Sequence, residues 1–126
     1  MNYNLLNGSN LAYIGDAYYE LMVRKHLLGK GITKNKDLRK ISINYVSCAS
    51  HKIIYDKISN QFTQEEKDIF LRGRNSAPSG HRKNVDRGAY VISSGLEAVI
   101  GYLYLKNDQQ RLDELIAEMF LAVEGE

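Results

Sequence analysis

The sequence predicts an all-α protein, and three observations carry this prediction. The chain of 126 residues contains a single proline, Pro78, so little in it obstructs long helices. No segment alternates apolar and polar residues in the manner of a half-buried strand. No Asn-Gly or Asp-Gly pair lies between two such segments, as it would in a β-hairpin.

The composition indicates one soluble domain spanning residues 1–126. Its 44% hydrophobic and 25% charged residues are ordinary for a folded protein. The single cysteine, Cys48, excludes an intramolecular disulfide and argues against a cysteine-built zinc site. The N-terminus lacks a signal-peptide pattern, and the most apolar segment, 89–105, is interrupted by Ser93, Ser94 and Glu97. We therefore expect a cytoplasmic protein that does not enter a membrane.

The first helix is expected to run from Ser9 or Asn10, either of which can cap it, to Leu28, where glycines at 29 and 31 supply a stop. Its predicted inner face comprises Leu11, Ile14, Tyr18, Leu21, Met22 and the stem of Lys25. A second helical region should begin near Asn35, continue past Ser47 and pass into another helix.

Two capping patterns predict where the later helices begin. Thr63 followed by Glu66 matches a capping box and opens a helix toward Leu71. Residues 75–84 favour a surface loop, after which a helix should run through Leu105. That helix is apolar around most of its circumference, so it should be central or covered by a second subunit. Asp108 caps a final helix with an apolar face made of Leu112, Leu115, Ile116, Met119 and Phe120.

Two carboxylates, Asp16 and Glu97, lie in segments that otherwise suit burial. Gly15 costs about 1 kcal/mol of helix stability relative to alanine, and such a glycine predicts close approach of another element. A divalent cation shared by both carboxylates is the simplest partner, with Glu20 as a candidate third ligand. The structural alternatives are a local hydrogen bond or lysine for Asp16, and an arginine such as Arg24 for Glu97 or Glu20.

In the sequence, a basic segment that contains glycines lies between the two carboxylates. The net charge is only +2, so any affinity for nucleic acid must come from such local clusters. Such a run of charged residues usually forms a solvated loop. The guanidinium groups of its arginines can, however, donate paired hydrogen bonds to phosphate oxygens. The candidate RNA-binding residues are Arg72, Arg74, Asn75, Arg82 and Lys83.

Three ordered motifs resemble the Mini-ribonuclease III family, the compact bacterial relatives of ribonuclease III. They are LAYIGDAYYE at 11–20, RGRN at 72–75 and GLEAVIGYLYL at 95–105. The likeness spans nearly the whole chain. It implies a ribonuclease III-type helical endonuclease domain that forms a homodimer, cleaves double-stranded RNA and leaves 5′-phosphate ends.

The resemblance also implies particular roles and partners. Asp16 and Glu97 would be the catalytic carboxylates, with Mg²⁺ as cofactor and Mn²⁺ as a substitute. The expected substrate is the precursor of large-subunit (23S) ribosomal RNA, and a ribosomal protein bound to it is a candidate partner. Larger ribonuclease III enzymes carry acidic residues where this chain has Ser9, Ala12 and Ser94, and they append a double-stranded RNA-binding domain that we do not expect here.

Two functions other than RNA cleavage are also compatible with the sequence. One is a non-catalytic RNA-binding or ribosome-associated module on the same fold, which the missing acidic positions make conceivable. The other is a helical interaction domain in which both carboxylates are structural.

Overall fold

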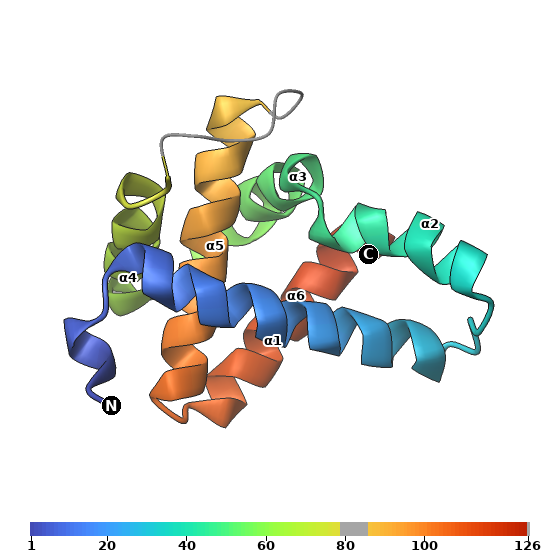
Figure 1. The fold of residues 1–126 in the computed structure, drawn as a ribbon, viewed down its shortest axis with the longest axis horizontal. Helices are drawn as coiled ribbons and strands as arrows, with labels where there is room; N and C mark the ends of the chain where they lie inside the picture. Colours follow the sequence, from blue (N-terminus) through green and yellow to red (C-terminus); the bar gives the residue numbers. More distant parts are fainter. Residues whose placement is uncertain (79–85, 126) are drawn as a thin grey trace.

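The structure, a computed structural model, describes residues 1–78 and 86–125, which form α-helices and two short 3-10 turns without a strand (Figure 1). The elements are η1 (Tyr3–Leu5), α1 (Gly8–Gly29), α2 (Asn35–Val46), α3 (Cys48–Ile58), η2 (Ser59–Gln61), α4 (Gln64–Asn75), α5 (Arg87–Leu105) and α6 (Gln109–Glu124). The all-α prediction is confirmed.

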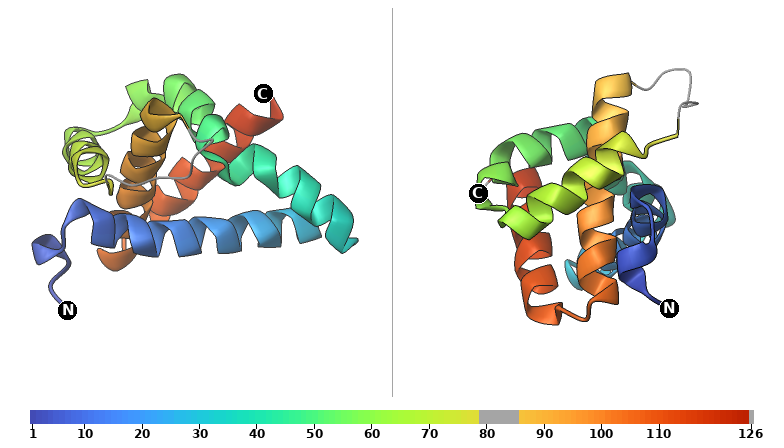
Figure 2. Two further views of the ribbon diagram at one scale, coloured as in Figure 1. Left: turned by 45° about the horizontal axis from the view of Figure 1, so that its top comes forward. Right: turned by 90° about the vertical axis from the view of Figure 1, so that its left-hand side faces the viewer.

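Helix α5 is the centre of the fold. It packs against α1, α3, α4 and α6, and Figures 1 and 2 show these helices arranged around it. Residues on every side of α5 are buried, including Leu96, Val99, Ile100 and Leu103. Among the described helices α5 alone is long and apolar enough to cross a membrane, yet most of it is enclosed by the protein. The central position of α5 therefore explains why the helix is apolar on most sides. Its apolar residues do not indicate a subunit interface.

The buried face of α1 differs from the predicted one. The structure buries Leu11, Gly15, Tyr19 and Val23, whereas Leu21 is 58% exposed. The prediction is confirmed for Leu11, and Tyr18 and Met22 pack partly buried against the core, but the prediction was wrong for Leu21 and missed Gly15, Tyr19 and Val23. A glycine contributes no apolar side chain to a helical pattern, yet Gly15 marks the face that lies against α5.

The helix boundaries agree with the predictions except in three places. Helix α4 continues through Asn75, beyond its predicted end near Leu71. Helix α1 begins at Gly8 and is capped by Asn7 rather than by Ser9 or Asn10; the Asn7 side chain accepts from the backbone N–H of Asn10 at 2.8 Å. Helix α2 does not continue past Ser47: that residue is extended and its side chain caps α3. The predicted capping box of Thr63 is present, and Asp108 caps α6 as expected.

Helices α1 and α5 cross in direct backbone contact. A Cβ atom at Gly15 would overlap the backbone carbonyl of Glu97, and one at Gly101 would overlap the carbonyl of Leu11. The close approach predicted for Gly15 is confirmed. Because Asp16 follows Gly15 and Glu97 lies at the contact itself, this crossing brings the two carboxylates together.

Gly15→Ala should lower the free energy of unfolding. Overpacking costs about 1–3 kcal/mol or more, which outweighs the gain of about 1 kcal/mol in helix propensity. Gly29→Ala is the matched control, because a Cβ there meets nothing within 4 Å. Urea titrations should show a loss for the first variant and no loss for the second. Equal effects of the two substitutions would contradict the close crossing.

Candidate functional site

A cleft of about 700 Å³ lies where α1, α2, α3 and α5 meet, and it brings the sequence-predicted carboxylates together. Asp16 and Glu20 line it from α1, and Glu97 lines it from α5. Ser9, Ala12 and Ser94 line the same cleft. The positions that are acidic in larger ribonuclease III enzymes therefore face this cleft too, but here they carry no charge.

Asp16 and Glu97 differ in exposure and interact directly. Asp16 is exposed, so its predicted burial was wrong, whereas Glu97 is half-buried. Burial, the charge of Asp16, a side-chain hydrogen bond with Asp16 and the charge of Glu20 together raise the pKa of Glu97 to about 9. This raised pKa favours the protonated form of Glu97 at neutral pH in the metal-free protein.

No cationic side chain among the described residues pairs with Asp16 or Glu97. Arg24, the structural partner considered for Glu97, instead bonds to Glu20 at 2.8 Å. Glu20 thus contributes charge to the cleft while its carboxylate is already paired on the surface.

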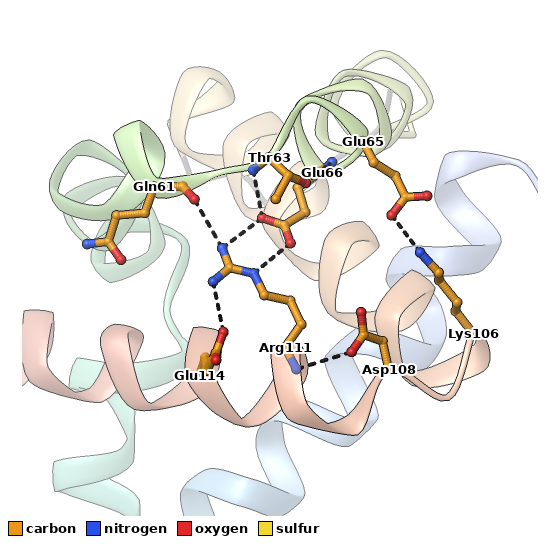
Figure 3. Close-up of polar contacts among 8 residues, drawn as sticks. All are labelled: Gln61, Thr63, Glu65, Glu66, Lys106, Asp108, Arg111 and Glu114. Atoms are coloured by element: carbon orange, nitrogen blue, oxygen red, sulfur yellow. Dashed lines mark hydrogen bonds and ion pairs between the residues drawn. The ribbon is translucent and has the colours of Figure 1, made fainter.

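Figure 3 shows how the same protein satisfies a buried glutamate that has a structural role. Glu66 is 2% exposed, and Arg111 grips both of its oxygens, with Nε 2.7 Å from Oε2 and Nη2 2.8 Å from Oε1. The backbone N–H of Thr63 also donates to it, at 3.0 Å. This arrangement ties α4 to α6. Glu97, by contrast, has no cationic partner in residues 1–78 and 86–125, which indicates that the cleft is built for a ligand.

The oxygen chemistry of the cleft fits a hard divalent cation. Mg²⁺ commonly binds through one or two carboxylates and completes its octahedron with waters and substrate phosphates. The described residues contain no group of three His, Cys, Asp or Glu side chains placed to hold a metal. The cleft thus suits an ion that depends on solvent or substrate for most of its ligands.

The predicted basic loop begins later than expected, because Arg72 to Asn75 form the last turn of α4. Gly73 does not break the helix: it packs against α5, where a Cβ would lie 2.9 Å from the Cα of Gly95. Arg72 is half-buried and donates to the backbone carbonyl of Leu6.

Two of the other candidate RNA-binding residues lie at the exposed end of α4. Arg74 and Asn75 are exposed at the end of α4, where the Nε of Arg74 lies 3.5 Å from the Oδ1 of Asn75. Arg82 and Lys83 lie outside the described residues. Arg74 is therefore the arginine of the α4 terminus that is best placed to meet a phosphate.

Sequence reasoning overlooked a second basic surface. Five exposed cations fall within eleven residues at the end of α1 and the start of α2: Lys30, Lys34, Lys36, Arg39 and Lys40. This density exceeds that of the segment between Arg72 and Arg87. One of the five is engaged, since Lys30 pairs with Glu124 at 3.0 Å. A count of cations per window would have found this surface.

Comparisons with known proteins establish the family of this chain. The model of the Ribonuclease III domain matches residues 9–108. Mini-ribonuclease 3 of Streptococcus pneumoniae is 40% identical over 124 residues, which cover 97% of each chain. Mini-ribonuclease 3 of Staphylococcus aureus is 40% identical over 121 residues, covering 94% of this chain and 90% of that one.

A solved structure has the same fold. The crystal structure of a Fusobacterium nucleatum protein superposes with a TM-score of 0.83 at 29% identity, covering 98% of this chain and 94% of the other. The helical fold and the carboxylate cleft define an endoribonuclease of the ribonuclease III type. The chain belongs to the ribonuclease III family and, within it, to the Mini-ribonuclease III group.

Removing the Glu97 carboxylate should stabilise the metal-free protein at neutral and alkaline pH. A carboxyl group whose folded pKa exceeds its unfolded value stabilises the fold below pH 4.5, and this contribution is lost as pH rises toward about 9. The Glu97→Gln variant has no carboxyl group to ionise at this position, so its stability does not fall in this way as pH rises. In EDTA, its advantage in unfolding free energy should grow with pH between these limits, by at most about 1.4 kcal/mol per unit. Parallel pH profiles for the two proteins would contradict the assignment.

Proposed function

We propose that this protein is a Mg²⁺-dependent endoribonuclease of the cytoplasm that cleaves double-stranded RNA and matures the ends of the 23S ribosomal RNA precursor. Family membership supports the reaction class. The observation that carries the metal dependence is the adjacent pair of carboxylates, Asp16 and Glu97, without a cationic partner among the described residues.

Asp16 and Glu97 would hold Mg²⁺ directly or through waters, and Mn²⁺ would substitute. When bound, the ion supplies an activated water for in-line attack on phosphorus and offsets charge on the leaving 3′ oxygen. The chain's own contribution is to fix both carboxylates on rigid helices and to keep Glu97 ready to lose its proton when a cation arrives. Glu20 adds negative charge to the cleft. The products carry 5′-phosphate and 3′-hydroxyl ends.

Duplex binding would come from cationic surfaces on either side of the cleft. Arg74 and Asn75 at the end of α4 would contact phosphates on one side. Arg82 and Lys83, which lie outside the described residues, remain candidate phosphate contacts from the sequence. The exposed cations at 30–40 offer a second phosphate-binding surface. Arg72 has a different role, because it holds the N-terminal segment against α4 through the carbonyl of Leu6.

A homodimer would place two clefts along one duplex, one for each strand, and would produce a staggered cut. Two exposed apolar residues at the cleft support this arrangement: Tyr13 is 81% exposed and Ile43 is 57% exposed. Burial of such side chains against a second copy would be favourable. A ribosomal protein bound to the precursor is a further candidate partner.

A non-catalytic RNA-binding module is the competing proposal, since three cleft positions lack the acids of larger enzymes. The Asp16–Glu97 pair, which has no cationic partner among the described residues, favours the enzyme, because the negative charge that Asp16 and Glu20 bring to the cleft repels an RNA phosphate unless a cation intervenes. A pure binding module would gain nothing from retaining that repulsion.

Cleavage of a labelled RNA duplex should require Mg²⁺ and should fall by more than about 100-fold in Asp16→Asn and Glu97→Gln, because each removes a group that holds the ion. Both variants should fold and should still bind duplex. Arg74→Ala should instead weaken duplex binding and reduce the slope of log K against log salt by about 1.

The outcomes separate the competing functions. Duplex binding without cleavage at any Mg²⁺ concentration would establish the binding module and exclude the enzyme. Loss of folding in both carboxylate variants, with unchanged affinity for divalent ions, would show that the pair is structural.

A further inference from the structure

A buried histidine stands directly behind the carboxylate cleft. His51 on α3 is 0% exposed, and its Nδ1 lies 2.6 Å from the Oγ of Ser93 on α5. Its ring packs edge-on against Tyr19, with centroids 5.4 Å apart. Its Nε2 has no hydrogen-bond partner among the described residues. Burial lowers the pKa of His51 to about 4, so the ring is neutral at physiological pH. The hydrogen bond to Ser93 joins this ring to α5, and the backbone of Tyr45 also acts on the ring as a hydrogen-bond partner.

Ser93 links His51 to the cleft. Its side chain is almost fully buried, yet it lines the cleft together with Asp16 and Glu97. Ser93 and Glu97 are four residues apart on α5, so both lie on the same face of that helix. A serine hydroxyl has one donor and two acceptor positions. In either tautomer, the imidazole occupies one of these positions and holds the Ser93 oxygen in place.

The neighbouring hydroxyl of Ser94 is used differently. It donates to the backbone carbonyl of Gly73 at 3.1 Å and so joins α5 to α4. No described group other than His51 bonds to the Ser93 hydroxyl. The remaining hydrogen-bonding positions of Ser93 are therefore available to what occupies the cleft.

We propose that the Ser93 hydroxyl is a third oxygen group of the divalent-cation site, beside Asp16 and Glu97, and that His51 is the residue that positions it. This proposal rests on the proposed function of the cleft. A hard, hydrated cation favours oxygen groups, either as direct ligands or as partners of its bound waters. The partners that orient such groups commonly change metal affinity by about 10–100-fold when removed.

The test is a double-mutant cycle of Ser93 and His51. The affinity of each full-length variant for Mn²⁺ is measured by electron paramagnetic resonance in the absence of RNA. Ser93→Ala should weaken Mn²⁺ binding by about 10-fold, and His51→Leu should weaken it similarly. The double variant should be no weaker than Ser93→Ala, because His51 acts through Ser93. His51→Asn, whose amide can replace Nδ1, should restore most of the affinity. Ser50→Ala, which removes a neighbouring α3 hydroxyl outside the cleft, is the control.

A second measurement uses only proteins with an intact His51. Mg²⁺ should shift the NMR signals of the His51 ring in the parent chain but not in Ser93→Ala. This readout decides the proposal even where His51→Leu does not fold.

The outcomes distinguish this proposal from the proposed function. Mn²⁺ affinity that is unchanged by Ser93→Ala would overturn the role of Ser93 while leaving the carboxylate site intact. Additive losses in the double variant would show that His51 acts by packing alone. Absence of Mn²⁺ binding in the parent chain would overturn both this proposal and the metal-dependent function.

Discussion

The contact between α1 and α5 is the constraint on which the site depends. Two glycines, Gly15 and Gly101, let the helix backbones meet where any larger residue would overlap a carbonyl group of the other helix. This contact fixes where Asp16 lies relative to Glu97, although they are 81 positions apart in sequence. Packing elsewhere in the core thus holds together two carboxyl groups that repel each other whenever both are ionised. The free energy that burial provides is thus used in part to maintain an unfavourable pair.

Two glutamates in the same small protein show how burial can serve structure or function. Glu66 is fully buried and receives two hydrogen bonds from Arg111 and one from the backbone of Thr63, so its negative charge is compensated locally. Glu97 is half-buried, and its pKa is raised first by burial and then by its acidic neighbours Asp16 and Glu20. The sign of the neighbouring charge separates the two cases: a cation compensates Glu66, whereas the charged neighbours of Glu97 that act on its pKa are acidic. This difference assigns Glu66 to stability and Glu97 to ligand binding.

Local sequence patterns predicted much of the fold and the central pair of the site. The helical class, the capping box at Thr63 and the cap at Asp108 depend on residues close in sequence, and the structure confirms each of them. The features that the sequence did not reveal depend on distant contacts. The hydrogen bond from Arg72 to Leu6 and that between His51 and Ser93 join segments 66 and 42 residues apart. No periodicity or motif encodes such pairings, because they arise only when the helices pack.

The central claim is that Asp16 and Glu97 together hold one divalent ion. The most direct measurement is a crystal structure of the protein soaked in Mn²⁺, with anomalous scattering used to locate the metal. We expect an anomalous peak in the cleft, with oxygens of both carboxylates bound to the ion or to its waters. An ion bound elsewhere, or carboxylates that remain bonded to each other at saturating Mn²⁺, would contradict this account.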